Sequence, residues 1–248
     1  MPPRIGRAFG LQVRSNRPVA VPRAGCYATR TVRIRQPEGA SVSRDFHVYE
    51  PARGHGLAHD PFNSIVGPRP IGWISTIDRD GRRNLAPYSF FNAFNYHPPI
   101  VGFCSMGYKD SVRNVEATGE FGWNLATLPL AEAMNASCAA VGPEVDEFEL
   151  GGLTPAPSRH INAPRVGESP VSFECRLTQM FPLQTADGRT LDSWMVFGEV
   201  VAVHIDRAML KDGVYQTAAA EPILRGGGPG DYFRITKEQK FVMMRPRM

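Results

Sequence analysis

Lys109, Asp110 and Ser111 stand at the start of a segment with the pattern of a short helix. A helix N-terminus attracts anions because its first N–H groups are unpaired and it carries a partial positive charge. A lysine just before the helix and a serine inside it add a cation and a hydroxyl donor, which together make a compact phosphate site. A capped surface helix with a solvated lysine would have the same residues, so this motif alone leaves both interpretations open.

The segment NLAPYSFFN at residues 84–92 is a second candidate site. It combines small polar donors with aromatic side chains and a proline, as a pocket for an amphiphilic ring system requires. A strand and a turn whose aromatic side chains belong to the core are the alternative. Trp73 could lie near a planar ligand, although a single tryptophan in a strand is more often a core residue.

The motifs of several common enzyme classes are absent from the sequence. There is no GxSxG, no HExxH and no Walker A segment, and the glycine-rich run at 226–230 lacks the GxGxxG spacing. His55 and His59 are four residues apart, but no helix supports that spacing, so we predict no metal site. The four cysteines form no CxxC pair, which favours reduced thiols in a cytoplasmic protein.

The elements that must position these candidates are mostly strands. Alternating or apolar runs predict strands at 71–77, 100–106, 121–126, 172–183 and 194–205, with hairpin turns at Asp80-Gly81 and Asp187-Gly188. The aromatic run at 84–95 suits a strand followed by a packed loop. Helices are expected at 110–119, with Asp110 as N-cap and Gly119 just past the end, and at about 129–140. Residues 142–170 are rich in loop signals.

Because helices do not alternate with these strands, a doubly wound parallel sheet is disfavoured. The sequence predicts a mainly β fold, a Greek-key or closed antiparallel barrel with a few short helices.

The net charge of +4 is unevenly distributed along the 248 residues. Residues 1–37 contain eight arginines and no acid, and the remainder has 20 basic and 24 acidic residues, a net of −4. The high pI therefore belongs to the Arg/Pro-rich residues 1–44, and it is not evidence for nucleic-acid binding. This extension reads as disordered, as a translated stretch before the true start, or as a transit peptide. No run approaches eighteen apolar residues, so no membrane span is expected.

Several motifs in a fixed order give the sequence a family resemblance. They are RPIGWIST at 69–76, DRDG at 78–81, NLAPYSFFN at 84–92, Pro98-Pro99, KDS at 109–111 with Asn114, GEF at 119–121 with Asn124, and Arg225-Gly226-Gly227 with Tyr232. This ordered set resembles the flavin reductase-like, FMN-binding split-barrel family over about residues 45–235. The extension at 1–44 lies outside the pattern, and the segment 142–170 is longer than in compact reductases, so substrate access can differ.

The resemblance implies a domain at 45–248 with a split β-barrel fold, a homodimer, and FMN near the subunit interface. Lys109 and Ser111 would hold the phosphate, and Tyr232 and Phe233 would close over the site. Trp73, Ser75 and Thr76 would lie along the flavin, and Asn84, Ala86, Ser89 and Asn92 would contact its ring and ribityl chain.

The implied activity is NAD(P)H-dependent reduction of flavin by hydride transfer to N5, with NADH or NADPH as donor. The flavin would carry the chemistry, so no protein acid or base is required and no catalytic side chain is predicted. A flavin-dependent monooxygenase is a candidate partner for the reduced flavin. The alternative is an FMN-containing electron carrier or flavin-binding protein without its own nicotinamide reaction.

Overall fold

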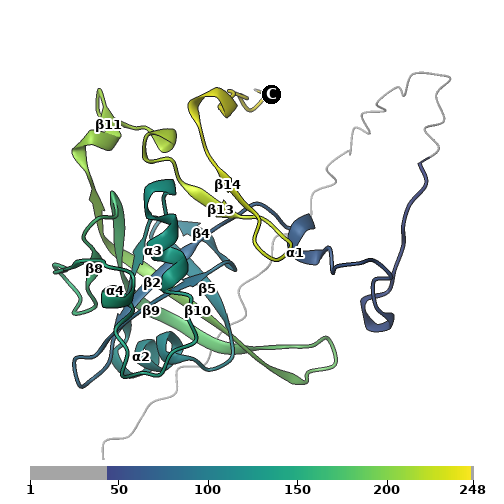
Figure 1. Ribbon diagram of the computed structural model, residues 1–248, viewed down its shortest axis with the longest axis horizontal. Helices are drawn as coiled ribbons and strands as arrows, with labels where there is room; N and C mark the ends of the chain where they lie inside the picture. The colour runs from purple at the N-terminus through teal and green to yellow at the C-terminus, as the bar shows by residue number, and fades with distance from the viewer. Residues whose placement is uncertain (1–43, 247–248) are drawn as a thin grey trace, which may run out of the picture. The chain divides into compact units, whose positions relative to one another are not determined.

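The computed structural model describes residues 44–246 (Figure 1). The predicted N-terminal extension at 1–44 therefore lies almost entirely outside the described residues. The chain divides between Val48 and Tyr49, and every helix and strand of the described part belongs to the portion that begins at Tyr49.

Seven antiparallel strands form the main sheet, in the order β3-β2-β6-β9-β10-β5-β4. Their bounds are β2 Gly72–Ile77, β3 Arg83–Tyr88, β4 Phe91–Tyr96, β5 Pro99–Met106, β6 Glu120–Asn124, β9 Val171–Gln184 and β10 Thr190–Ile205. Three small sheets join β1 Arg69–Pro70 with β13 Ile223–Arg225 and β14 Tyr232–Arg234, β7 Pro155–Ala156 with β8 Arg165–Val166, and β11 Leu210–Lys211 with β12 Val214–Tyr215. The predicted mainly β class is confirmed.

The helices are short. They are α1 Phe62–Ile65, α2 Asp110–Thr118, α3 Ala131–Ala136 and α4 Glu147–Leu150, with 3-10 turns at Pro51–Arg53, Leu128–Leu130, Arg207–Met209, Thr217–Ala220 and Lys237–Gln239.

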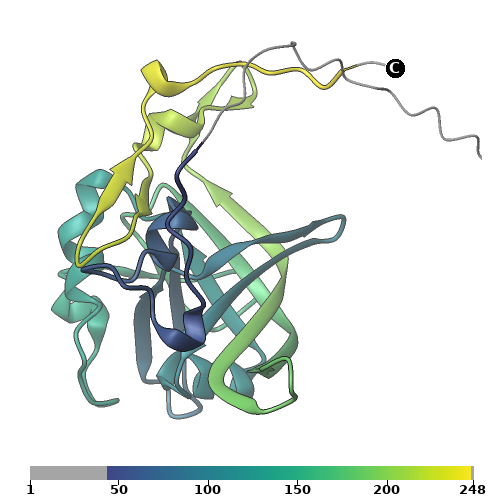
Figure 2. The same ribbon diagram turned by 90° about the vertical axis from the view of Figure 1, so that its right-hand side faces the viewer.

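The main sheet curls into a barrel because its two edge strands are neighbours in the sequence. β3 and β4 lie at opposite ends of the strand order, yet only Ser89 and Phe90 separate them. The backbone N–H of Cys104 on β5 donates to the carbonyl of Phe90 at 2.8 Å, and the rings of Tyr88 and Phe103 lie 4.7 Å apart. These contacts bring the edges together without pairing β3 with β4, so the barrel is split there (Figure 2).

Both predicted hairpin turns are confirmed. Gly81 lies between β2 and β3 at φ 85°, and Gly188 lies between β9 and β10 at φ 86°. Glycine adopts this left-handed backbone without the steric cost that a Cβ would bring.

Strand β2 is buried on both of its faces. Ile74 belongs to an apolar cluster with Phe103, Phe121 and residues of β9 and β10, whereas Trp73 belongs to a second cluster formed with α3 and α4. Successive side chains of a strand point to opposite faces, so the unbroken burial of β2 means that helices cover its second face. Figure 1 shows α3 and α4 on that side of the sheet.

Helix α2 confirms one predicted boundary and corrects the other. Gly119 ends the helix in the left-handed conformation, at φ 74°, and its N–H donates to the carbonyl of Val115. The predicted N-cap was one residue late, since Lys109 holds the extended N-cap conformation and Asp110 is the first helical residue. The Asp110 side chain pairs with Arg113 instead of capping the helix.

Other boundaries moved for local reasons. The segment 84–95, expected to be a strand and a packed loop, is two strands, β3 and β4, separated by the bend at Ser89 and Phe90. The predicted helix at 129–140 is a 3-10 turn at Leu128–Leu130 followed by only six α-helical residues. Residues 142–170 are mostly loop, as predicted, and contain the four-residue α4 and the β7–β8 pair.

Candidate functional site

A cavity of about 440 Å³ lies where β3 meets the N-terminus of α2 and the segment after α3. Its walls include four of the predicted site residues: Asn84, Ala86, Lys109 and Ser111. The remaining wall residues are Pro87, Tyr88, Tyr108, Asp110, Arg113, residues 137–141 and Glu147.

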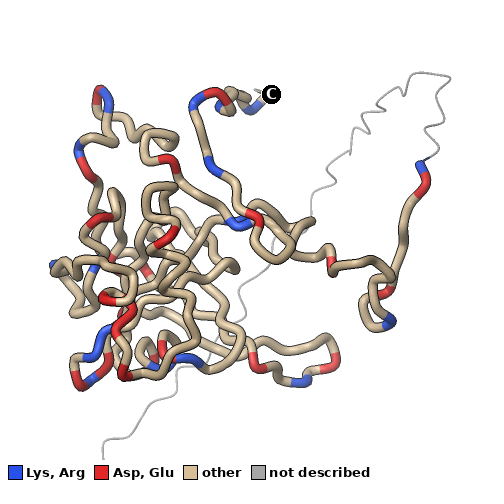
Figure 3. Tube along the Cα trace, in the orientation of Figure 1, with Lys and Arg blue, Asp and Glu red and all other residues tan. Residues whose placement is uncertain are grey.

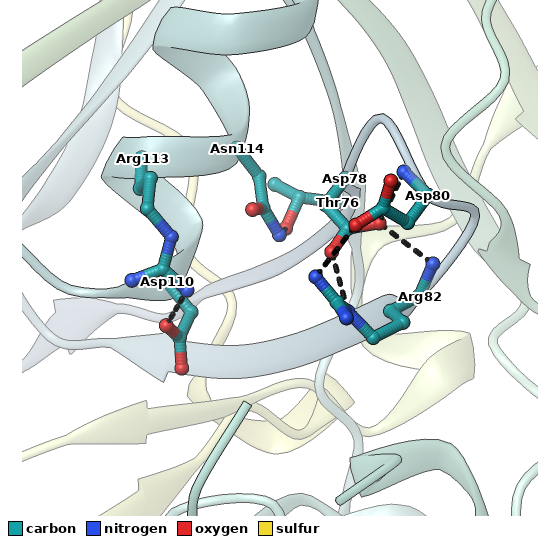
Figure 4. Close-up of polar contacts among 7 residues, drawn as sticks. All are labelled: Thr76, Asp78, Asp80, Arg82, Asp110, Arg113 and Asn114. Carbon is teal, nitrogen blue, oxygen red and sulfur yellow. Dashed lines mark hydrogen bonds and ion pairs between the residues drawn. The ribbon is translucent and has the colours of Figure 1, made fainter. Parts of the chain in front are cut away.

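Hydrogen bonds fix the polar wall of this cavity. The amide Nδ2 of Asn84 donates to Ser111 Oγ at 2.9 Å and to Thr76 Oγ1 at 3.2 Å. Asn114, one turn along α2, donates to the same Thr76 hydroxyl at 3.1 Å (Figure 4). All four side chains are buried, so the network sets the position of Ser111 relative to β2 and β3.

The charges around Lys109 favour an anion. Asp110 pairs with Arg113 on the same helix (Figure 4), so each of these two charges has an immediate partner. Lys109 is exposed and forms no ion pair with any residue between 44 and 246. Its ammonium group and the N-terminus of the nine-residue α2 therefore act on the same region of the cavity.

Trp73, Ser75 and Thr76 lie behind the cavity wall. All three side chains are fully buried, and none of them lines the cavity. Trp73 Nε1 donates to Ser137 Oγ at 3.0 Å, and Ser75 Oγ accepts from Asn124 Nδ2 at 3.2 Å. Thus Trp73 and Thr76 hold residues of the wall in place, and direct contact of these three side chains with a ligand would require them to move.

Four further predicted residues lie outside the cavity. The carbonyl of Ser89 accepts from Arg69 Nε at 3.1 Å, and Asn92 lines a separate apolar groove of about 660 Å³. Tyr232 and Phe233 on β14 are 41% and 54% exposed, and the guanidinium of Arg225 lies 5.1 Å from the centre of the Tyr232 ring. The structure does not bring these four residues together with Lys109 and Ser111.

Glu147 is a cavity residue that the sequence did not single out. It belongs to the acidic run 146–149, within the loop-rich segment 142–170. Its side chain is buried at 6% exposure, and Oε2 accepts the backbone N–H of Leu85 at 3.1 Å. Charged residues also gather in the β2–β3 and β9–β10 hairpins (Figure 3). Only the packing of α4 against β3 distinguishes Glu147 from its acidic neighbours.

Burial shifts the proton equilibria of two cavity groups. Burial, with the nearby acids Asp110 and Asp146, raises the pKa of Glu147, although the N–H of Leu85 acts in the opposite direction. Burial also raises the pKa of Tyr88, which the hydroxyls of Ser111 and Ser105 partly oppose. Both groups therefore favour their neutral forms more than exposed residues of the same type.

Neither a metal centre nor a membrane-spanning helix occurs within residues 44–246. No group of three or more His, Cys, Asp or Glu side chains is placed to hold a metal ion. No helix in this range is long and apolar enough to cross a membrane.

Comparison with known proteins identifies the family. Residues 67–223 match the family model described as the flavin reductase like domain. An uncharacterized protein of Aquifex aeolicus is 38% identical over 170 residues, which are 66% of this chain and 83% of that protein.

Solved structures of similar fold support the same family assignment. Nitrilotriacetate monooxygenase component B from Bacillus cereus has a TM-score of 0.73 and 26% identity, covering 81% of this chain and all of that one. A Shewanella frigidimarina protein assigned as a flavin reductase with a split barrel domain has a TM-score of 0.65 and 26% identity. The match covers 75% of this chain and 90% of that protein. The chain therefore belongs to the flavin reductase-like family of split-barrel proteins, a family of flavin-related oxidoreductases.

Proposed function

We propose that this protein binds FMN in the 440 Å³ cavity and catalyses NAD(P)H-dependent flavin reduction. The observation that carries this proposal is the meeting of Lys109, Ser111 and the α2 N-terminus with Asn84 and Ala86 of β3 in one cavity.

The residues present fit FMN. The cavity volume lies within the range of roughly 300–1,000 Å³ that is typical of small-molecule sites. One part of the wall offers a cation and a hydroxyl, as a phosphate requires, and another offers the small apolar side chains Ala86, Ala139, Ala140 and Val141, as a flat ring requires. Ala86 has no side-chain bulk beyond Cβ, which leaves room beside β3 for a planar group.

The side chains have separate roles in this proposal. Lys109 and Ser111 bind the phosphate. Asn84 orients Ser111 through the hydrogen bond that its Nδ2 donates. Since Nδ2 also donates the bond to Thr76, the Oδ1 of Asn84 is left to accept from a ribityl hydroxyl. Thr76 and Trp73 contribute by holding Asn84 and Ser137 in place.

Bound FMN would supply the redox chemistry by accepting a hydride from the nicotinamide. The protein's own task is then to bind and orient the two ring systems and to exclude water, and no side chain has to act as acid or base.

A homodimer and an oxygenase partner belong to the same proposal. Strand β4 exposes Phe94 and Tyr96, at 54% and 80%, beside the apolar groove that contains Asn92. A second copy of the chain would remove this apolar surface from water and would bring Asn92 into an interface. Nitrilotriacetate monooxygenase component B is, by its name, one part of a monooxygenase, which supports delivery of reduced flavin to a separate oxygenase.

The test is an absorption titration of the purified protein with FMN, followed by anaerobic addition of NADH or NADPH. Bound flavin that bleaches with either nicotinamide supports the reductase and identifies its donor. If bound flavin stays oxidised, the protein is an electron carrier and not a reductase. If FMN does not bind, the FMN site is refuted. Light scattering on the same sample tests the dimer.

A further inference from the structure

Glu147 is the buried acidic group on the cavity wall to which the proposed function gives no role. Its neighbour in space, Leu85, adjoins Asn84 in β3, and Asn84 bonds to Ser111 at the proposed phosphate site. Glu147 also lines a small second pocket with Asn84, Asp110 and Arg113. The carboxyl group therefore lies on the same wall as the groups that would bind an anion.

The charges around Glu147 leave it without a cation. On α4 itself, Asp146 forms an ion pair with Arg83 of β3, and the exposed Glu149 lies 3.5 Å from the same arginine. On α2, Asp110 pairs with Arg113. No cation in residues 44–246 pairs with the Glu147 carboxyl, which accepts the backbone N–H of Leu85 and its own backbone N–H.

The remaining titratable groups that line the cavity are Tyr88, Lys109, Tyr108 and Cys138. The hydrogen bond to Glu116 raises the pKa of Tyr108, and burial raises the pKa of the Cys138 thiol, so both favour their neutral forms. Tyr88 is neutral in the physiological range, since burial raises the pKa of its phenol further above the usual value. Lys109 is the cation proposed to bind phosphate. A phosphate monoester brings about two negative charges at pH 7. An ionised, buried Glu147 would repel that charge, whereas a protonated Glu147 would not, and its O–H could donate a hydrogen bond.

We propose that Glu147 takes up a proton from solvent when FMN binds, and that the neutral carboxyl then serves as a hydrogen-bond donor to the bound cofactor. This inference rests on the proposed FMN site. The elevated pKa of Glu147 in the free protein means that the proton is gained at a higher pH than an ordinary glutamate would allow.

The inference gives FMN binding a characteristic pH dependence. The phosphate's own second ionisation, near pH 6, makes binding to Lys109 tighter as pH rises. Proton uptake by Glu147 acts in the opposite sense, because a rising pH removes the proton that binding needs. Its contribution is at most about a tenfold loss of affinity per pH unit, from one linked proton.

Glu147→Gln isolates this contribution. Glutamine keeps an oxygen to accept from Leu85 and has an amide that donates as the protonated acid would, but it does not titrate. FMN affinity is measured by fluorescence quenching at intervals from pH 6 to 8. We expect the ratio of the wild-type Kd to the E147Q Kd to increase with pH, so that the variant binds more tightly than wild type at pH 8. Glu149→Gln, on the same helix but outside the cavity, should follow wild type.

A ratio that stays constant from pH 6 to 8, with FMN bound by both proteins, would overturn the role of Glu147 and leave the FMN site intact. Failure of the wild-type protein to bind FMN would overturn both. Calorimetry of wild type alone covers the case in which E147Q does not fold. At pH 7.5, where the phosphate is mostly ionised, titration in two buffers of different ionisation enthalpy should show net proton uptake with FMN and none with riboflavin. No uptake with FMN would refute the inference.

Discussion

Replacing Lys109 by alanine tests the part of the proposed site that the sequence and the structure support together. Lys109 precedes α2 and lines the cavity, and it has no anionic partner within residues 44–246. Its ammonium group is therefore available to a phosphate. The substitution removes this cation and leaves Ser111 and the helix N-terminus in place.

The size of the effect follows from the exposure of the lysine. A hydrogen bond to a charged group contributes about 1.5–3 kcal/mol. Lys109 is exposed to water, which weakens its electrostatic interactions, so the lower end of that range applies. We expect Lys109→Ala to weaken FMN binding by about 1.5 kcal/mol, or roughly tenfold in Kd.

The assay is quenching of flavin fluorescence, with riboflavin as a second ligand. Riboflavin lacks the phosphate, so the variant and wild type should bind it equally. Lys211→Ala removes an exposed lysine of β11, away from the cavity, and should bind FMN as wild type does. If Lys109→Ala binds FMN as tightly as wild type, or loses riboflavin equally, Lys109 does not bind the phosphate.

Three substitutions test the scaffold. Thr76→Val leaves two buried amide donors without their shared acceptor and should lower the free energy of unfolding by about 1–3 kcal/mol in urea titrations. Gly198→Ala should cost about 1–3 kcal/mol in the same assay, because the new Cβ would lie 2.5 Å from a ring carbon of Phe121. Burial alone would raise the pKa of Glu174, but the N–H of Arg159, the His204 side chain and the N–H of His160 lower it overall. The urea midpoint of wild type should therefore fall as pH drops from 5 towards 3, and Glu174→Gln should show a smaller fall over the same range.

Each substitution has a control and a contrary outcome. Thr76→Ser keeps the hydroxyl and should unfold close to wild type, so an equal loss in both variants would contradict the hydrogen-bond argument. Gly230→Ala meets no atom within 4 Å and should be neutral, and a stable Gly198→Ala would mean that Phe121 can shift. The stability contributed by Glu174 rises with pH, as for any carboxyl with a depressed pKa, because its ionised form stabilises the fold at neutral pH and acid removes this contribution. An unchanged pH profile in Glu174→Gln would exclude that source.

The local signals in the sequence were sufficient for the elements and for the polar core of the site. Gly81, Gly119 and Gly188 marked turns and a helix end because only glycine adopts a left-handed backbone at little cost. Lys109 and Ser111 could be paired as a candidate phosphate site because they are close in sequence at a helix start, where the chemistry is local. Their approach to Asn84 followed from the family resemblance.

Tertiary structure decided which residues face the cavity. The residue pattern favoured a core position for Trp73, whereas the family resemblance placed Trp73, Ser75 and Thr76 along the flavin. An alternating strand does not reveal whether its second face is covered, so the pattern alone could not decide. Trp73 is buried against α3 and α4, Ser75 lies against Asn124 of β6, and Thr76, on the opposite face from Trp73, is covered by α2 through Asn114. In the same way, the bend at Ser89 turned Asn92 towards the apolar groove, away from the cavity.

Glu147 is the clearest case of a burial that the local sequence could not predict. Its sequence neighbours Asp146 and Glu149 are equally acidic, and nothing in the local sequence distinguishes the three carboxyl groups. Only the docking of α4 on β3, more than sixty residues away in sequence, buries one carboxyl against the Leu85 N–H and leaves Glu149 in water. The sequence by itself thus determined the strands, the turns and a candidate anion site. Burial and the resulting shifts in proton affinity depend on long-range packing, and only the tertiary structure could decide them.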